Sequence, residues 1–288
     1  MSNPIEKDFN LGGSVDKALA GDFELKSLDV IREAWQLTMQ NLLRFSPAVL
    51  ILIGIQAVIF FFALKMQVGD LSNVLNMFQD PETLDPSIFQ SIFVANFSYE
   101  VITAPIYAGI AMMAMSHAAG LKTETRHITK GLSFTVPVIL VAMINLLLQA
   151  VAGAIFPFLS FYLSIAFSNA ILLVCEKRMT PMNALWTSLR GVNKRLFAVA
   201  TIYLVAMLMF FAGLMMYGLG LIIAVPFFFH VKGIIYRNMF GIRLQIVAKG
   251  PSSSDDSNND SGSTPEEKPQ DKPEEDNNHR PGSNTFDA

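Results

Sequence analysis

Only one of the 288 residues is a cysteine, and only 16% are Asp, Glu, Lys or Arg. A single cysteine, Cys175, cannot form an intramolecular disulfide. Soluble domains contain about 25% charged residues, so this low charge, together with 52% hydrophobic residues, argues against a water-exposed fold. The first 25 residues contain five acids and no apolar run, which excludes a signal or transit peptide. We therefore expect a membrane protein whose first apolar segment is retained.

The chain also lacks the patterns that carry common chemistry. No His, Cys or Ser is placed for nucleophilic catalysis, no Gly-rich loop could bind a phosphate, and no basic stripe alternates with aromatics as in nucleic-acid-binding proteins. Three methionines and His117 in the stretch MMAMSHAAG resemble Cu(I) ligands, but adjacent methionines lie on different helix faces, so we interpret them as packing residues. The sequence predicts no enzyme, metal, cofactor or nucleic-acid partner.

Apolar segments recur along the chain, each near the roughly 20 residues that a helix needs to span a bilayer. They are 47–64, 101–119, 132–156, 158–175, 196–217 and 219–239. If the chain crosses the membrane at each of these six segments, only Lys65 of the 21 Lys and Arg lies on the side opposite the termini. Because basic residues are enriched in cytoplasmic loops, we predict an all-α polytopic protein with about six spans and both termini in the cytoplasm.

Two segments that precede membrane spans show apolar residues at spacings of three and four, which predicts amphipathic helices on the cytoplasmic surface. The first stripe is Leu28, Ile31, Trp35, Thr38, Leu42 and Phe45, and the second is Met182, Leu185, Leu189, Val192 and Leu196. We expect the first helix to end at Ser46 and Pro47, where the span begins. We expect Thr180 to cap the second, with Pro181 in its first turn.

The long outer loop, 66–100, alternates acidic and apolar residues. Its acids do not have the ligand spacing of a calcium loop. We predict two short amphipathic helices on the outer membrane surface, with Asp85 capping the second and Pro86 in its first turn.

The composition divides the chain into three parts. We predict a flexible cytoplasmic arm over 1–26, a membrane domain over 27–249 and a disordered tail over 250–288, which has no aliphatic stripe. The tail carries ten acids and three bases, so its removal would change the formal charge from −3 to +4. It is interpreted as a solubilising segment or, alternatively, as a site for a basic protein partner. A weak parallel repeat relates 27–119 to 180–241.

The stretch TPMNALWTSLRGVNKRLF, the hairpin GLMMYGLGLIIAVP and the closing YRNMFG resemble uncharacterised bacterial inner-membrane families of the YciC type. They also resemble the membrane domain of some glycerophosphodiester phosphodiesterases. The resemblance is strongest over 171–241. It implies a six-helix domain in a bacterial inner membrane. It does not imply an enzyme, because we find no attached phosphodiesterase domain in this sequence. In such families several positions look structural, here Pro181, Asn193, Gly218, Gly220, Pro226, Tyr236 and Arg237.

Polar residues inside apolar segments mark the candidate sites, because each is costly in lipid. His230 and Lys232 precede Arg237 in the last span, and Lys232 can extend to the cytoplasmic interface. With Lys177 and Arg178 they form a predicted pocket for an anionic lipid head group. The leading hypothesis is a non-enzymatic inner-membrane protein that binds lipid or a partner protein through its basic cytoplasmic face and interfacial helices, in a homeostasis or scaffold role.

Amide side chains inside the apolar segments support an alternative function, the transport of a small solute. Asn145 and Gln149 lie four residues apart on one helix face, and Asn169 lies in the next span. We expect these amides to form hydrogen bonds between helices. We also expect no membrane-embedded Asp or Glu, since Glu100 and Glu176 fall at the ends of their segments. If the amides instead line a solute path, the protein is a small-solute transporter or channel.

Overall fold

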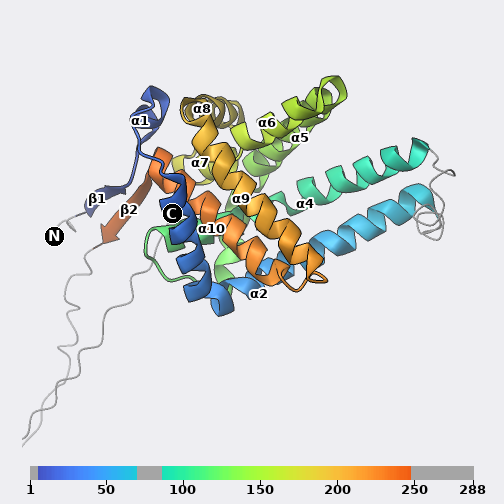
Figure 1. Ribbon diagram of the computed structural model, residues 1–288, viewed down its shortest axis with the longest axis horizontal. Coiled ribbons are helices and arrows are strands. Elements are labelled where there is room, and N and C mark those ends of the chain that lie inside the picture. The colour runs from blue at the N-terminus through green and yellow to red at the C-terminus, as the bar shows by residue number, and fades with distance from the viewer. Residues whose placement is uncertain (1–5, 70–85, 248–288) are drawn as a thin grey trace, which may run out of the picture. The chain divides into compact units, whose positions relative to one another are not determined.

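The computed structural model describes residues 6–69 and 86–247, so the predicted acidic tail lies outside the described residues. Contacts divide the described residues into a large unit, which lies within 10–243, and a small one made of 6–9 and 244–247. The elements, labelled in Figure 1, are β1 (Glu6–Leu11), α1 (Val15–Ala20), α2 (Ser27–Val68), α4 (Pro86–Ala118), the 3₁₀ helix η2 (Thr125–Phe134), α5 (Thr135–Ile155), α6 (Pro157–Ala166), α7 (Ala170–Lys177), α8 (Pro181–Lys194), α9 (Leu196–Met215), α10 (Leu221–Phe240) and β2 (Ile242–Val247).

Six helical stretches are long and apolar enough to cross a bilayer. They are Ser27–Val68, Gln90–Ala118, Thr125–Ile155, Pro157–Lys177, Leu196–Met215 and Leu221–Phe240. Large apolar side chains are exposed along them; on α9 they include Leu204, Leu208 and Phe211, each at least half exposed. Such surfaces are unfavourable in water and match lipid. The six predicted spans and the all-α polytopic membrane fold are confirmed.

The N-terminal segment is folded where the structure describes it. β1 pairs with β2 in a two-stranded sheet. α1 begins at Ser14, whose Oγ accepts a hydrogen bond from the amide of Lys17, and it ends at Gly21 in the left-handed region. The amide of Gly13 donates to the carbonyl of Arg237 at 3.0 Å. The sequence predicted a flexible arm over 1–26, whereas the structure places a strand and a capped helix within it.

α2 does not end at Ser46, as the sequence predicted, but continues through Pro47 to Val68. Proline inside a helix removes a hydrogen bond and bends the helix without always ending it. Figure 1 shows α2 changing direction between its darker and lighter blue parts. The expected interfacial helix and the first span are thus one bent helix.

The predicted stripe on the first half of α2 is only partly buried. Leu28 is 77% exposed and Trp35 is 46% exposed, whereas Val30, Ala34 and Thr38 are buried. Phe45 of the predicted stripe is also fully buried, so the buried face combines these small side chains with one large aromatic ring. Small residues let helix backbones approach closely in membrane bundles, and this is the part of the chain against which α10 packs.

α4 packs against α2, α5, α10 and η2. It begins at Pro86, so the predicted second outer-surface helix is the first part of a membrane span; the first predicted helix falls in the undescribed residues 70–85. Gly109 is required for the close contact with η2, because an added Cβ would lie 2.0 Å from the carbonyl oxygen of Ile128. The three methionines before His117 are buried in α4.

α8 forms a separate helix with Pro181 in its first turn, as predicted. Thr180 is the N-cap residue, as predicted, in extended conformation, although its side chain makes no capping hydrogen bond. Leu185 and Val192 are buried while Met182 is 64% exposed. The repeat predicted for 27–119 and 180–241 stays a prediction, and α2 is one helix where α8 and α9 are two.

Candidate functional site

A cavity of about 350 Å³ lies between the helices of the large unit. A volume of this size is typical of sites for small molecules. Its polar lining residues are Gln56 from α2, Tyr99, Glu100, Thr103 and Tyr107 from α4, Asn145 from α5, Ser164 from α6, Ser168 from the α6–α7 connection, Tyr203 from α9 and Lys232 from α10. All of them belong to the six spans. We call this hollow the central cavity.

Lys232 lies at the wall of the central cavity and is 5% exposed. Its Nζ donates a hydrogen bond to Tyr107 Oη at 2.8 Å and lies 4.8 Å from the centre of that ring. No acidic group lies within 4 Å of it among the described residues. The prediction that Lys232 extends to the interface near Arg237 is therefore wrong, since its ammonium is directed into the bundle.

Glu100 lines the same cavity. Its Oε1 accepts a hydrogen bond from Asn96 Nδ2 at 3.2 Å, one turn earlier on α4. In the described part of the chain, no cation lies within 4 Å of it. The sequence placed Glu100 at the end of a segment, because the span was taken to start at 101. α4 starts fifteen residues earlier, so Glu100 falls inside a candidate span. The expectation that no Asp or Glu lies inside a span is therefore wrong.

The fourth span is interrupted beside the cavity. α6 ends at Ala166 and α7 begins at Ala170, so the backbone between them is not helical. Ser188 on α8 bonds to both ends of this break: its Oγ donates to the carbonyl of Ala166 at 2.7 Å and accepts from the amide of Asn169 at 3.3 Å. Non-helical backbone at membrane depth is tolerated where protein buries it or a polar cavity solvates it.

The three predicted amides have different surroundings. Gln149 Nε2 donates to Asn145 Oδ1 at 2.8 Å within α5, so this bond does not join two helices as expected. Asn145 lines the central cavity, and Gln149 does not. Asn169 is fully buried at the helix break, and its Oδ1 has no hydrogen-bond partner among the described residues.

The predicted lipid-head-group cluster is not assembled. Arg237 forms a two-bond ion pair with Glu33 of α2, at 2.6 and 2.8 Å, and also donates to the carbonyl of Ala118. Lys177 lies 3.0 Å from Glu176 on the same helix. Arg178 lies over the ring of Phe134, at 5.6 Å. Each of these cations therefore has a partner of its own, and only Lys232 reaches the cavity.

His230 belongs to a buried chain of hydrogen bonds that sequence reasoning did not find. Its Nδ1 lies 3.0 Å from Thr38 Oγ1 and its Nε2 lies 2.9 Å from Nδ1 of His117, whose Nε2 lies 2.8 Å from Thr123 Oγ1. All four side chains are at most 7% exposed. We call these residues the histidine chain.

The direction of the bonds in the histidine chain follows from proton counting. Thr38 Oγ1 donates its only proton to the carbonyl of Ala34 at 2.7 Å, so it must accept from Nδ1 of His230. Nε2 of His230 then accepts from Nδ1 of His117, and Nε2 of His117 accepts from the hydroxyl of Thr123. Two neutral rings, each protonated on Nδ1, satisfy every bond.

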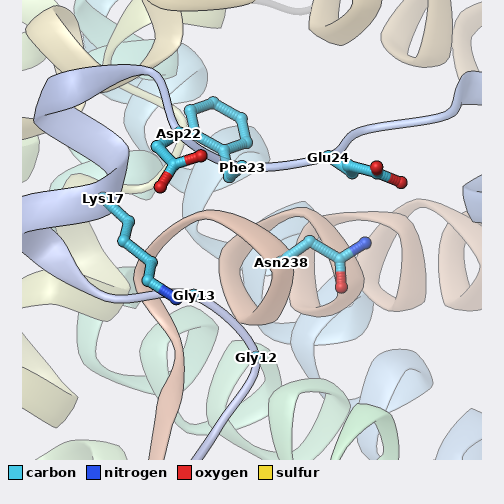
Figure 2. Close-up of a pocket in the computed structure, with 7 residues that line it drawn as sticks. All are labelled: Gly12, Gly13, Lys17, Asp22, Phe23, Glu24 and Asn238. Carbon is cyan, nitrogen blue, oxygen red and sulfur yellow. The ribbon is translucent and has the colours of Figure 1, made fainter.

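A second hollow, of about 300 Å³, lies where the N-terminal segment passes α10 (Figure 2). Gly12, Lys17, Asp22 and Glu24 line it, and all four are exposed. Gly12 lies directly on the backbone of Arg237, since an added Cβ would lie 2.2 Å from that carbonyl oxygen. This hollow reflects how the segment is attached and gathers no buried polar side chain.

Five of the ten polar residues that line the central cavity were visible in the sequence as polar residues inside apolar segments, namely Gln56, Asn145, Ser164, Ser168 and Lys232. Tyr107 and Tyr203 were missed because tyrosine is compatible with an apolar helix and with a membrane interface alike. The Lys232–Tyr107 hydrogen bond joins residues 125 positions apart, which no local pattern reveals. Compared with family models, curated proteins and solved structures, the chain matches none of them at a significant level.

Proposed function

We propose that this chain is a non-enzymatic, multi-pass protein of a bacterial inner membrane that binds the anionic part of a lipid head group in the central cavity. The observation that carries the proposal is Lys232, a buried amine at the wall of a polar cavity with no acid within 4 Å among the described residues. The unequal distribution of Lys and Arg along the sequence supports cytoplasmic termini.

The physical argument concerns the cost of a buried charge. An ionised amine within a membrane span is costly unless an anion or several polar groups compensate it. The hydroxyl and ring of Tyr107 supply one hydrogen bond and a cation–π contact, which compensate only part of this cost. A phosphate in the cavity would supply the missing negative charge. We therefore place the lipid contact inside the bundle rather than on the basic cytoplasmic surface.

Native mass spectrometry of protein extracted gently from its own membrane tests this proposal. The wild-type chain is expected to retain a lipid at a fixed ratio, and Lys232→Gln is expected to lose it. Lys65→Gln is the matched control, because Lys65 is exposed near the end of α2 and lies outside the cavity. A wild-type chain without lipid, or equal retention in Lys232→Gln, contradicts the proposal.

Small-solute transport is the second candidate, favoured by the helix break at the cavity. Discontinuous helices commonly form the substrate sites of transporters, and here Ser168 of the break lines the cavity. Replacing Asn145 by Leu should then abolish solute flux into liposomes, whereas Gln149→Leu, outside the cavity lining, should reduce it less. Under the lipid-binding proposal neither change creates or removes a flux.

An interaction of the acidic tail with a protein partner is a further proposal, supported by its ten acids. Co-purification with and without residues 250–288 tests it, and identical partners in both preparations would contradict it.

A further inference from the structure

We propose that the ligand of the central cavity is a zwitterion, with an anionic group at Lys232 and a primary ammonium group at Glu100. This inference rests on the proposed function and names the class of head group. The supporting observation is that both charged residues line one cavity and that neither is ion-paired within the described residues. A ligand with a single negative charge would leave Glu100 uncompensated and would be repelled by it.

The spacing of the two charges suits a small dipolar group. Glu100 and Tyr107 lie seven residues apart on α4, which places them on one helix face about 10 Å apart along the axis. Lys232 Nζ lies 2.8 Å from Tyr107 Oη. Glu100 and Lys232 both line the central cavity, so one small ligand can contact both side chains. A two-carbon spacer between ammonium and phosphate gives a zwitterion of this small size.

Hydrogen-bonding capacity divides the cavity in the same way. At one end of the cavity, Lys232 offers its remaining N–H groups and Tyr107 can donate its own hydroxyl proton. The buried hydroxyl of Tyr203 makes no hydrogen bond of good geometry, and Ser168 is its polar neighbour. These are donors for a phosphate or carboxylate.

The other end offers acceptors. Asn96 bonds to Oε1 of Glu100, so Oε2 is the oxygen available to a ligand. Gln56 donates through Nε2 to Thr103 Oγ1 at 3.2 Å, which leaves its carbonyl oxygen as an acceptor. A primary ammonium has three N–H donors for such oxygens, whereas a quaternary ammonium has none. The chemistry therefore favours an ethanolamine-like group over a choline-like one.

Two sources supply this chemistry, a phosphatidylethanolamine head group and a free zwitterion such as phosphoethanolamine or glycine. About 350 Å³ holds a polar head group but not two acyl chains. A lipid would leave its chains outside the lining, and the exposed Ser164 on α6 marks where the cavity meets the surface of the bundle. Competition by soluble zwitterions distinguishes the two sources.

The experiment measures retained lipid by native mass spectrometry after exchange of the full chain into mixtures of phosphatidylethanolamine, phosphatidylglycerol and phosphatidylcholine. The wild type should prefer phosphatidylethanolamine. Glu100→Gln removes the acid, so retention of phosphatidylethanolamine should fall at least about tenfold relative to phosphatidylglycerol. Glu24→Gln, at an exposed position, should keep the wild-type order. If 10 mM phosphoethanolamine or glycine displaces the lipid, the site accepts the free zwitterion.

The outcomes separate the two proposals. Loss of all lipid in Lys232→Gln with an unchanged order of preference in Glu100→Gln overturns the zwitterion assignment and leaves the proposed function standing. Equal retention in Lys232→Gln and wild type overturns the proposed function itself. If Glu100→Gln does not fold, the wild-type protein supplies the test. Its retention of lipid should fall stepwise as the ethanolamine nitrogen is methylated. Retention that does not change with methylation would overturn the assignment.

Discussion

The Nδ1 atom of His117 lies 2.9 Å from Nε2 of His230, and together the two rings join α4 to α10 in the interior of the bundle. The rings are nearly parallel, with an interplanar angle of 22°. Phe45 of α2 lies against both, at 5.4 and 4.9 Å between ring centres. Three helices therefore meet at one polar contact enclosed by an aromatic side chain.

Replacing Thr38 by Val should destabilise the fold. The change removes the acceptor for Nδ1–H of His230 and leaves this buried donor without a partner, at a cost of about 1–3 kcal/mol. Thr201→Val is the matched control, because Thr201 bonds the carbonyl four residues before it in the same way but is exposed on α9. Thermal unfolding in detergent measures both, and equal melting temperatures would contradict a stabilising role for the Thr38–His230 hydrogen bond.

Both rings of the histidine chain should be neutral and protonated on Nδ1. This follows because Thr38 donates to the carbonyl of Ala34 and can only accept from His230. Solid-state NMR of ¹⁵N-histidine-labelled protein in lipid should give Nδ1–H signals for both residues, assigned by comparison with His117→Gln and His230→Gln. An Nε2–H signal from His230 would show that the chain runs in the opposite direction.

The ion pair between Glu33 and Arg237 should contribute measurably to stability. It has two short hydrogen bonds, and its side chains are 37% and 18% exposed. A double-mutant cycle with Glu33→Gln and Arg237→Gln should give a coupling of about 1 kcal/mol or more. The same cycle at the exposed Glu24 and Lys26, which lie 3.5 Å apart, should give close to zero. Equal couplings would argue against a structural role for Arg237.

Ser188→Ala should weaken the interrupted fourth span. The carbonyl of Ala166 and the amide of Asn169 would both lose their partner, at a cost of about 1–3 kcal/mol. Ser98→Ala is the control, since Ser98 bonds only a carbonyl within its own helix. The measurement is chemical unfolding in mixed micelles, and equal loss of stability in both variants would contradict a special role for Ser188.

The spans could be predicted because length and hydropathy are local properties of the sequence. The buried faces of the helices could not be predicted, because lipid is as apolar as the bundle interior. The periodicity of apolar residues therefore does not distinguish a face that contacts lipid from a face that contacts other helices. On α2 the predicted stripe contains Leu28 and Trp35, which are exposed, as well as Phe45, which is buried, while the buried face also includes Ala34 and Val30. A soluble helix with the same pattern would bury its largest apolar residues.

The candidate site was predicted in part for a related reason. Polar residues within spans are recognisable one by one, and Lys232 and Asn145 do line the cavity. Their partners are distant in sequence: Arg237 was assigned to lipid because nothing local indicates its ion pair with Glu33, 204 residues away. Glu100 was placed at an interface because the start of α4 was predicted too late.

The gap between α6 and α7 divides the fourth span into two short rigid rods joined by three residues, Phe167, Ser168 and Asn169. A continuous helix resists bending through its ladder of backbone hydrogen bonds, and here that ladder is interrupted. The joint is attached to α8 through Ser188 and faces the central cavity through Phe167 and Ser168. A molecule that enters the cavity therefore touches the joint between α6 and α7, and Ser188 of α8 is bonded to that same joint.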